Sequence, residues 1–338
     1  MNPTANRRSV LLGGAALATL GSFGLPRMAR AATRLDLSEV LPEDNWQTIE
    51  IRKFAADVAE RTGGEVEIVI HSGGALGFKG PEHLQAVGNG LVPMADLLGA
   101  QAAGNAPILK LENLPFLVKS PEELKTLHSF LRPEFDKVAT KFNQKFLTTM
   151  PSPQNSIFMK EEATSLDALA GTKVRAADMT GKETFDYLGF TGVQIPWGEL
   201  IPALATGRVD GVGTSSTSAV DGKFWEFMGY IYPTNHIWAT NFLSIGLEAW
   251  NGLSPEAQEA LAAASEEWTP KFWEASKAKG DAANATLVEN GMKMVEIPDD
   301  MLAEMQERTK PMIAAYAEEV PEAGPIIEDF LAAVGRSA

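Results

Sequence analysis

Arg175 is the residue of this chain whose type and position most directly suggest chemistry. It ends a β-branched stretch in the run LAGTKVRAADMTGK (169–182), and the small residues Ala176 and Ala177 follow it. A planar guanidinium can hold a carboxylate through two parallel hydrogen bonds, which neutral donors do not match in strength. It could instead form a structural salt bridge to one of the chain's 44 acidic residues, so position alone leaves both roles open.

A strand followed at once by a helix is expected to position this arginine. Thr180 and Glu183 have the spacing of a capping box, which predicts a helix that begins near Gly181 and runs toward Gly189. Arg175 then lies at the carboxyl end of a strand, just before a helix amino terminus, where the potential favours an anion. The sequence therefore allows an anion-binding position here, with the structural salt bridge as the alternative.

The first 31 residues differ in character from the rest. Arg7 and Arg8 precede a short apolar run, and small residues near Ala31 offer a cleavage site. This pattern predicts that residues 1–31 are a twin-arginine-like signal peptide and that the mature protein is periplasmic. A membrane-anchoring helix is the alternative, but the run is short for a span and glycines interrupt it.

Charge and cysteine content restrict the possible partners. Residues 1–31 hold four arginines and no acid, so the formal charge of −15 becomes −19 without them. Such a surface repels nucleic acid and anionic lipid. There is no cysteine, and the four histidines lie too far apart for a zinc pair. The sequence predicts a soluble exported protein with no metal, no cofactor, no nucleic acid and no membrane insertion.

Alternating strand and helix patterns predict an α/β protein. We expect a two-lobed, periplasmic-binding-protein-like fold with mixed sheets, an interlobe cleft and long C-terminal helices. Residues 32–150 are assigned to lobe I, completed by parts of 251–338, and residues 151–250 to lobe II. Within lobe II, residues 236–250 read as one long strand. Residues 251–338 read as a helical return segment that packs across both lobes. Ligands bind in such clefts, at the carboxyl ends of strands.

Several motifs are similar, in order and spacing, to those of one family. LAGTKVRAADM (169–179), followed by PWGELIPALATGRVDGV (196–212), resembles the signature of the DctP-type solute-binding proteins of tripartite ATP-independent periplasmic (TRAP) transporters. GGALG (73–77), LENLPFLVKSPEEL (111–124) and GLEAWNGLSPEAQEAL (246–261) agree in order. The resemblance covers nearly the whole mature chain.

The resemblance implies which second-lobe residues bind the ligand. Arg175 would bind the carboxylate of an organic acid, and Trp197 would pack on the ligand unless it is plain core. Thr214 and Ser215 would contact the ligand, unless the hydroxyls of this stretch only cap the next helix. Asn155 stands where some members carry a second arginine, which weakens a sialic-acid-like or dicarboxylate specificity.

Four further residues complete the predicted binding set. The resemblance implies Asn241 on the long return strand, and Phe78 and Gln101 from the first lobe. We also include Asp178, three residues after Arg175.

Three other polar residues are expected to be structural. Glu199 and Asp210 could suggest a carboxylate pair for acid–base work, but Glu199 lies at a predicted helix start and Asp210 at a strand-to-turn step. His236 has no serine or aspartate partner that the sequence identifies, so we expect an ordinary, partly buried histidine.

These observations predict an extracytoplasmic solute receptor, not an enzyme. It would capture a small organic acid between two lobes that close about a hinge. With one arginine near Trp197 and Phe78, a monocarboxylate with an apolar or aromatic body is expected. The resemblance implies the small and large TRAP membrane subunits as partners. A receptor for another importer or a sensor is one alternative; an exported α/β enzyme is another, although we find no nucleophile elbow, metal set or phosphate loop.

Overall fold

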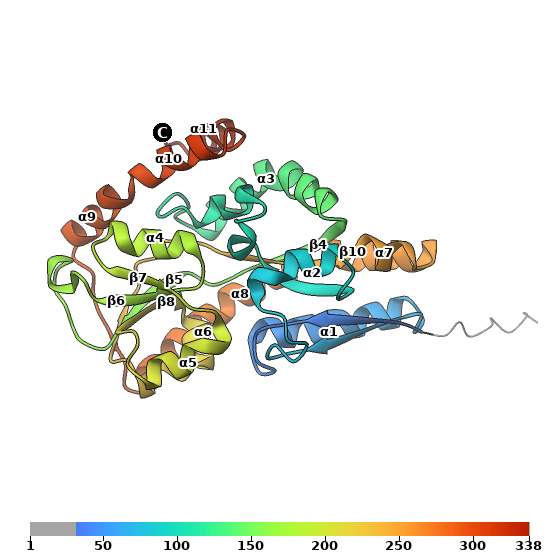
Figure 1. The fold of residues 1–338 in the computed structure, drawn as a ribbon, viewed down its shortest axis with the longest axis horizontal. Coiled ribbons are helices and arrows are strands. Elements are labelled where there is room, and N and C mark those ends of the chain that lie inside the picture. The colour runs from blue at the N-terminus through green and yellow to red at the C-terminus, as the bar shows by residue number, and fades with distance from the viewer. Residues whose placement is uncertain (1–31, 338) are drawn as a thin grey trace, which may run out of the picture. The chain divides into compact units, whose positions relative to one another are not determined.

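A computed structural model describes residues 32–337 of the chain, and the predicted signal peptide, residues 1–31, lies outside them. Helices surround two mixed β-sheets (Figure 1). The strands are β1 Thr33–Ser38, β2 Val66–His71, β3 Met94–Leu98, β4 Gln144–Pro151, β5 Asn155–Met159, β6 Lys173–Ala176, β7 Thr191–Gln194, β8 Gly211–Ser215, β9 Tyr230–Tyr232, β10 Thr240–Gly246 and β11 Lys293–Met294. The α-helices are α1 Trp46–Arg61, α2 His83–Gly88, α3 Pro121–Lys141, α4 Met179–Tyr187, α5 Trp197–Ala205, α6 Ser216–Asp221, α7 Leu247–Asn251, α8 Pro255–Glu289, α9 Asp299–Thr309, α10 Pro311–Glu319 and α11 Ala323–Ala333.

The first sheet has the strand order β2-β1-β3-β10-β4. β1 pairs in parallel with β2 and β3, whereas β10 runs antiparallel to both of its neighbours, β3 and β4. We predicted residues 151–250 for lobe II, and β10 corrects that boundary because it lies in the first sheet. An apolar run can fill the centre of either sheet, so its pattern does not reveal its neighbours. The predicted strand 236–250 is also shorter than expected, since α7 begins at Leu247.

The second sheet has the order β11-β9-β5-β8-β6-β7. β6 pairs in parallel with β7 and β8, and β5 runs antiparallel to β8 and β9. Both sheets are therefore mixed, as predicted. The chain passes between the sheets three times: from β4 to β5, from β9 to β10, and through α7 and α8 to β11.

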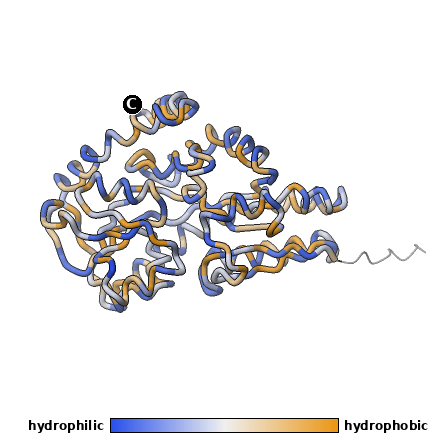
Figure 2. The backbone as a smooth tube through the Cα atoms, in the orientation of Figure 1, coloured by the Kyte–Doolittle hydropathy of each residue, from blue (hydrophilic) through white to orange (hydrophobic). Residues whose placement is uncertain are grey.

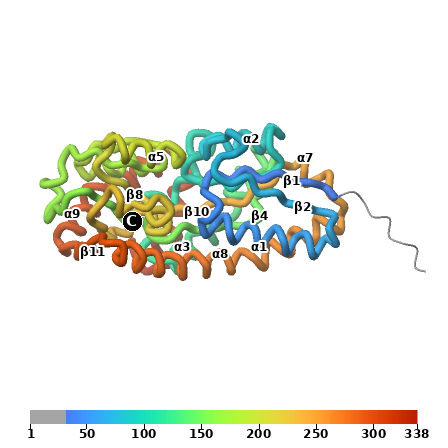
Figure 3. The backbone as a smooth tube through the Cα atoms, turned by 90° about the horizontal axis from the view of Figure 1, so that it is seen from below, coloured from blue at the N-terminus to red at the C-terminus, as the bar shows by residue number. Residues whose placement is uncertain are grey.

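The long helix α8 contacts elements of both lobes. Ser254 caps it by accepting a hydrogen bond from the Ala257 backbone N–H at 3.1 Å. The helix packs against α1 and β4, which belong to the first lobe, and against α6, which belongs to the second. Figure 3 shows it in orange beside α1. Beyond it lie α9, α10 and α11, within the segment that we predicted to be helical. Pro311, which lacks a backbone N–H, separates α9 from α10.

Each sheet has its own apolar packing. Leu35, Leu37 and Phe54 belong to a buried cluster on the first sheet, and Phe158 and Val212 to one on the second. Figure 2 shows hydrophobic colours gathered on the strands and on one face of many helices. Burial of these faces is the main stabilising contribution to such a fold. Among residues 32–337 we find no helix that combines the length and apolarity needed to cross a bilayer.

Candidate functional site

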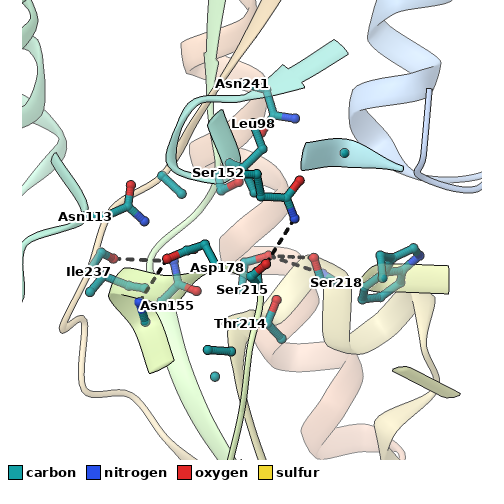
Figure 4. Close-up of a pocket in the computed structure, with 18 of the residues that line it drawn as sticks. Leu98, Asn113, Ser152, Asn155, Asp178, Thr214, Ser215, Ser218, Ile237 and Asn241 are labelled. Atoms are coloured by element: carbon teal, nitrogen blue, oxygen red, sulfur yellow. Dashed lines mark hydrogen bonds between the residues drawn. The ribbon is translucent and has the colours of Figure 1, made fainter. Parts of the chain in front are cut away.

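A cavity of about 90 Å³ is lined by residues from both sheets. Parallel strands contribute residues at or near their carboxyl ends, such as Arg175 on β6 and Ser215 on β8. The antiparallel strands contribute residues at or next to their starts: Asn155 pairs with Ser215, and Asn241 pairs with Leu98. Figure 4 shows Leu98 and Asn241 on one side of the cavity, facing Thr214 and Ser215 on the other. Strand ends from both sheets therefore meet at this cavity.

Arg175 is buried in the wall of this cavity, with 2% of its surface exposed. Its Nε donates a hydrogen bond to the Ile195 carbonyl at 2.9 Å, which fixes the guanidinium. Within residues 32–337, neither Nη1 nor Nη2 forms a hydrogen bond or an ion pair. Burial lowers the pKa of Arg175 to about 10, and the nearby Asp178 opposes that shift. The guanidinium therefore stays cationic at neutral pH, and its two Nη nitrogens remain free to donate hydrogen bonds.

Asp178 caps the helix that follows. Its Oδ1 accepts a hydrogen bond from the Gly181 backbone N–H at 2.9 Å, so α4 begins at Met179. We predicted Thr180 as the cap and a start near Gly181, and the structure corrects both. An aspartate three residues before the bonded N–H fits the cap geometry as well as a threonine does. Burial raises the pKa of Asp178, while the Gly181 hydrogen bond and Arg175 oppose the rise.

The hydroxyl residues of the second lobe divide into capping and unpaired groups. Ser215 caps α6 by accepting from the Ser218 backbone N–H at 3.3 Å, and its hydroxyl lies 3.1 Å from that of Ser218 (Figure 4). The alternative that these hydroxyls cap a helix is therefore correct for Ser215, which also lines the cavity. Thr214 lines the cavity, and its hydroxyl has no hydrogen-bond partner among the described residues.

Two asparagines at strand starts line the cavity with their amide nitrogens already engaged. Asn155 donates to the Ile237 carbonyl at 3.4 Å, and Asn241 donates to Asp96 Oδ2 at 2.9 Å. Because each amide nitrogen faces protein, each side-chain oxygen is left as an acceptor, without a partner in the described part of the chain.

Gln101 crosses between the two walls of the cavity. Its Nε2 donates to the Ala177 carbonyl at 3.1 Å, which joins the segment after β3 to the segment after β6. Gly80 makes room for it, because a Cβ at that position would collide with Gln101 Oε1. Trp197 is half-buried, lines the cavity and also packs against the second-sheet core. Trp197 is therefore part of the hydrophobic core and of the cavity lining at once.

Phe78 is the predicted site residue that the structure does not bring to this cavity. It packs against a small cluster that includes Ala86 and Val92. The other eight predicted residues, Gln101, Asn155, Arg175, Asp178, Trp197, Thr214, Ser215 and Asn241, all line the cavity. Their contacts with a ligand stay predictions.

The sequence analysis missed several polar residues of the first lobe. Asp96 lines the cavity and lies beside Glu39, and both carboxyl groups are buried. Burial raises the pKa of Asp96 to about 6, while burial and the neighbouring Asp96 raise that of Glu39 well above its usual value. Two buried carboxyl groups this close together favour protonation of one of them. The position of an aspartate inside the apolar strand run VPMADLL could have indicated Asp96 as a site residue.

Asn113 and Gln47 also line the cavity, and the sequence analysis named neither as a site residue. Asn113 is fully buried, and its side-chain nitrogen and oxygen both lack a partner; the same holds for Gln47 Nε2. Asn113 stands within the motif LENLPF, so attention to its one uncharged polar residue could have found it.

The three residues expected to be structural lie outside the cavity lining. Glu199 pairs with Lys79 at 2.8 Å, and Asp210 lies 3.4 Å from Lys160. His236 is fully buried, whereas we expected partial burial, and it shares a 2.6 Å hydrogen bond with the Thr234 hydroxyl. Burial lowers its pKa to about 4. Over residues 32–337 no group of three His, Asp or Glu side chains is placed to hold a metal.

Comparisons with known proteins agree on one family and one fold. The family "Bacterial extracellular solute-binding protein, family 7" (DctP) matches residues 37–319. A marine-metagenome TRAP solute-binding protein, solved with co-purified pyroglutamate, is 30% identical; it has a TM-score of 0.84, and the match covers 88% of this chain and 98% of that one.

Two further solved structures are similar. DctP7 of Bordetella pertussis, an extracytoplasmic solute receptor that binds pyroglutamic acid, is 25% identical with a TM-score of 0.85, over 88% of this chain and 99% of that one. A TRAP periplasmic solute-binding protein of Chromohalobacter salexigens, with bound D-glucuronate, is 21% identical with a TM-score of 0.82, over 88% and 98%. The last of these shows likeness of fold alone.

Proposed function

Because this chain belongs to the DctP family of bacterial extracellular solute-binding proteins, we propose that Arg175 binds the carboxylate of its solute in the cavity between the two sheets. The family consists of TRAP-type receptors for small organic acids that act outside the cytoplasm and are not enzymes. The predicted family, fold class, periplasmic location and lack of enzymatic activity are therefore confirmed. The identity of the acid and its contacts are the subject of the proposal.

The unpaired edge of Arg175 is the observation that carries the proposal. A buried guanidinium with one of its five N–H groups bonded costs free energy unless an anion completes it. A carboxylate accepts two parallel hydrogen bonds from such a fork and neutralises its charge. Asp178 does not take this place, because its carboxylate caps α4 instead.

The charges around the cavity favour an acid with a single carboxylate. Arg175 is the one cation among the described residues that line it, whereas Asp96 and Asp178 are acids. A second carboxylate on the ligand would find no cation and would face these two side chains. Asn155, at the position where some relatives carry an arginine, adds no charge.

The size and the apolar lining favour a compact body. A cavity of about 90 Å³ admits only a compact body, such as a small ring or short chain. Trp197, Ile237 and Leu98 supply apolar surfaces for its faces. Pyroglutamate, which two of the similar structures bind, is an acid of this size. We therefore propose a compact monocarboxylate whose faces are apolar.

Closure of the two lobes and delivery to membrane subunits complete the proposed function. The Gln101–Ala177 hydrogen bond and the Lys79–Glu199 ion pair join the two walls of the cavity and would form as the lobes close on the ligand. The small and large membrane subunits of a TRAP transporter would then receive the acid.

Native mass spectrometry of the protein purified from its source tests this function. We expect a co-purified acid with one carboxylate, and we expect Arg175→Ala to lose it. Thermal shift with monocarboxylates, dicarboxylates and neutral sugars provides an independent measurement, since only a bound compound raises the melting temperature. Stabilisation by neutral sugars alone, or full retention of the acid by Arg175→Ala, would contradict the proposal.

A further inference from the structure

Asn113 has an unusual environment for a buried amide. It is the last residue of a 3₁₀ segment, Pro107–Asn113, and its side chain is fully buried. Neither its Nδ2 nor its Oδ1 has a hydrogen-bond partner among residues 32–337, and the residue lines the cavity. Native proteins rarely leave both ends of a buried amide unpaired, so the pair of free groups requires an explanation.

A hydrogen bond between the residues before them fixes the position of Asn113 relative to Asn241 in the cavity lining. Glu112 Oε2 accepts from the Thr240 hydroxyl at 2.9 Å and lies 2.6 Å from His128 Nε2. Glu112 precedes Asn113, and Thr240 precedes Asn241, so this buried contact holds the 3₁₀ segment against the start of β10. The two asparagines are therefore fixed on the same wall of the cavity.

Asp96 determines which end of the Asn241 amide faces the cavity. Because Asp96 Oδ2 accepts the Asn241 N–H at 2.9 Å, the amide nitrogen points at protein and its oxygen stays available. The first-lobe wall then offers one donor, Asn113 Nδ2, and two acceptors, Asn113 Oδ1 and Asn241 Oδ1. A ligand that lacks polar groups leaves all three unpaired.

We propose that Asn113 and Asn241 are specificity-determining residues, which select acids that carry a group able both to donate and to accept hydrogen bonds. The inference rests on the proposed function, because Arg175 holds the carboxylate. A lactam is the best match, since its N–H and C=O lie side by side as those of a carboxamide do; a hydroxyl meets the same requirement. Apolar faces and a polar edge then belong to one ligand.

Matched pairs of acids test the inference by isothermal titration calorimetry. Pyroglutamate is compared with cyclopentanecarboxylate, and D-glucuronate with cyclohexanecarboxylate. We expect the polar member of at least one pair to bind at least about 100-fold more tightly, because buried polar groups left unpaired reject the analogue strongly. Equal binding within both pairs, preference for the apolar acids, or no binding by any of the four overturns the inference.

Asn113→Leu separates selectivity from stability. We expect this variant to reduce the preference for the polar acid by about 10-fold or more, and to melt at least as high as wild type without ligand, since it removes an unpaired buried amide. Thr148→Val, which removes a buried hydroxyl of β4 outside the cavity, is the matched control and should leave the preference unchanged.

The outcomes for the two proposals are distinct. An unchanged preference in Asn113→Leu overturns the inference, and it leaves the proposed function intact if Arg175→Ala abolishes binding of the same acid. Retained binding in Arg175→Ala contradicts the proposed function itself.

Discussion

A single side chain, Arg175, concentrates the chemistry of this site. Its guanidinium is buried and held through Nε, so the remaining N–H groups are directed before any ligand arrives. Such preorganisation reduces the cost of ordering the side chain on binding. The same burial destabilises the ligand-free protein, and the carboxylate that we propose would relieve that cost.

Arg175→Lys tests whether the fork geometry or only the charge matters. A lysine keeps the positive charge but cannot form two parallel hydrogen bonds, and it loses the Nε contact to Ile195. We expect affinity for the co-purified acid to fall by about 10- to 100-fold, since hydrogen bonds to charged groups are worth about 1.5–3 kcal/mol. Titration calorimetry measures it, and undiminished affinity in the lysine variant would show that charge alone suffices.

At the scale of residues, the sequence predicted the cation better than its surroundings. Arg175 stood out because a permanent charge at a strand end requires a partner. Asn113 and Gln47 did not, because amides are common on surfaces and their burial depends on tertiary packing. Phe78 was inferred from a motif position, but the glycine-rich turn before it directs the ring to a small apolar cluster.

The elements around the site place its residues through caps and strand ends. Asp178 caps α4 and Ser215 caps α6, so each of these two strand-to-helix turns is closed by a hydrogen bond from a backbone N–H. Because the caps lie in the cavity wall, local helix stability and site geometry depend on the same side chains.

Asp178→Ala is expected to lower the free energy of unfolding by about 0.5–2 kcal/mol, the usual cost of losing an N-cap. Asp178→Asn retains an acceptor for the Gly181 N–H and removes a buried carboxylate whose pKa burial raises. We therefore expect the asparagine variant to be close to wild type. Urea unfolding followed by circular dichroism compares the two, and equal losses would rule out the capping explanation.

Gly280 in α8 packs against the segment between β4 and β5. A Cβ there would lie 2.8 Å from Pro153 Cβ, so we expect Gly280→Ala to destabilise the protein, although alanine gains about 1 kcal/mol of helix propensity over glycine. Gly324 in α11 has open space around it, and Gly324→Ala should stabilise or be neutral. The melting temperatures of both variants, compared with wild type, test this. A higher melting temperature for Gly280→Ala would contradict the close contact with Pro153.

At the scale of elements, most strands and helices followed from periodicity and caps. Asn45, Ser120 and Ser254, which are residue types that favour the N-cap position, each cap a helix in the structure. The sheet that receives β10 was assigned wrongly because pairing partners lie far apart in sequence and apolar runs look alike. The other predicted lobe boundaries stay predictions.

Across the whole molecule, few polar contacts join the two walls of the cavity. Besides Gln101–Ala177 and Lys79–Glu199, Asn45 Nδ2 donates to Asp221 Oδ2 at the end of α6. The Lys79–Glu199 pair is exposed, so water screens its attraction and it adds little to stability. The Asn45–Asp221 contact is more buried and therefore responds to pH.

The pKa of Asp221 is raised to about 6, chiefly by burial and also by Asp44, while the Asn45 hydrogen bond opposes the rise. The folded protein thus binds this proton more tightly than the unfolded chain, whose value is near 3.8. The stabilisation is complete below the unfolded value and is lost as pH rises through about 6.

Asp221→Asn is therefore expected to become more stable than wild type as pH rises from 4 to 7, by roughly 1–3 kcal/mol for a shift of about two units that partial exposure reduces. Unfolding free energies at both pH values provide the measurement. Asp281→Asn, at an exposed carboxyl on α8, is the control and should show no such gain. A gain of equal size at pH 4 would exclude protonation as the cause.

The three passages of the chain between the sheets have a mechanical consequence. The junction of α9 and α10 bridges them again, because α9 packs on a second-sheet cluster and α10 on a first-sheet cluster. Bodies joined at several points can bend about the line of the connections, but twisting must strain all of them together. Helix α8, packed beside both bodies, adds torsional stiffness along the same line. The proposed opening would therefore be mainly a bend, and the distance between one dye on each lobe would report it.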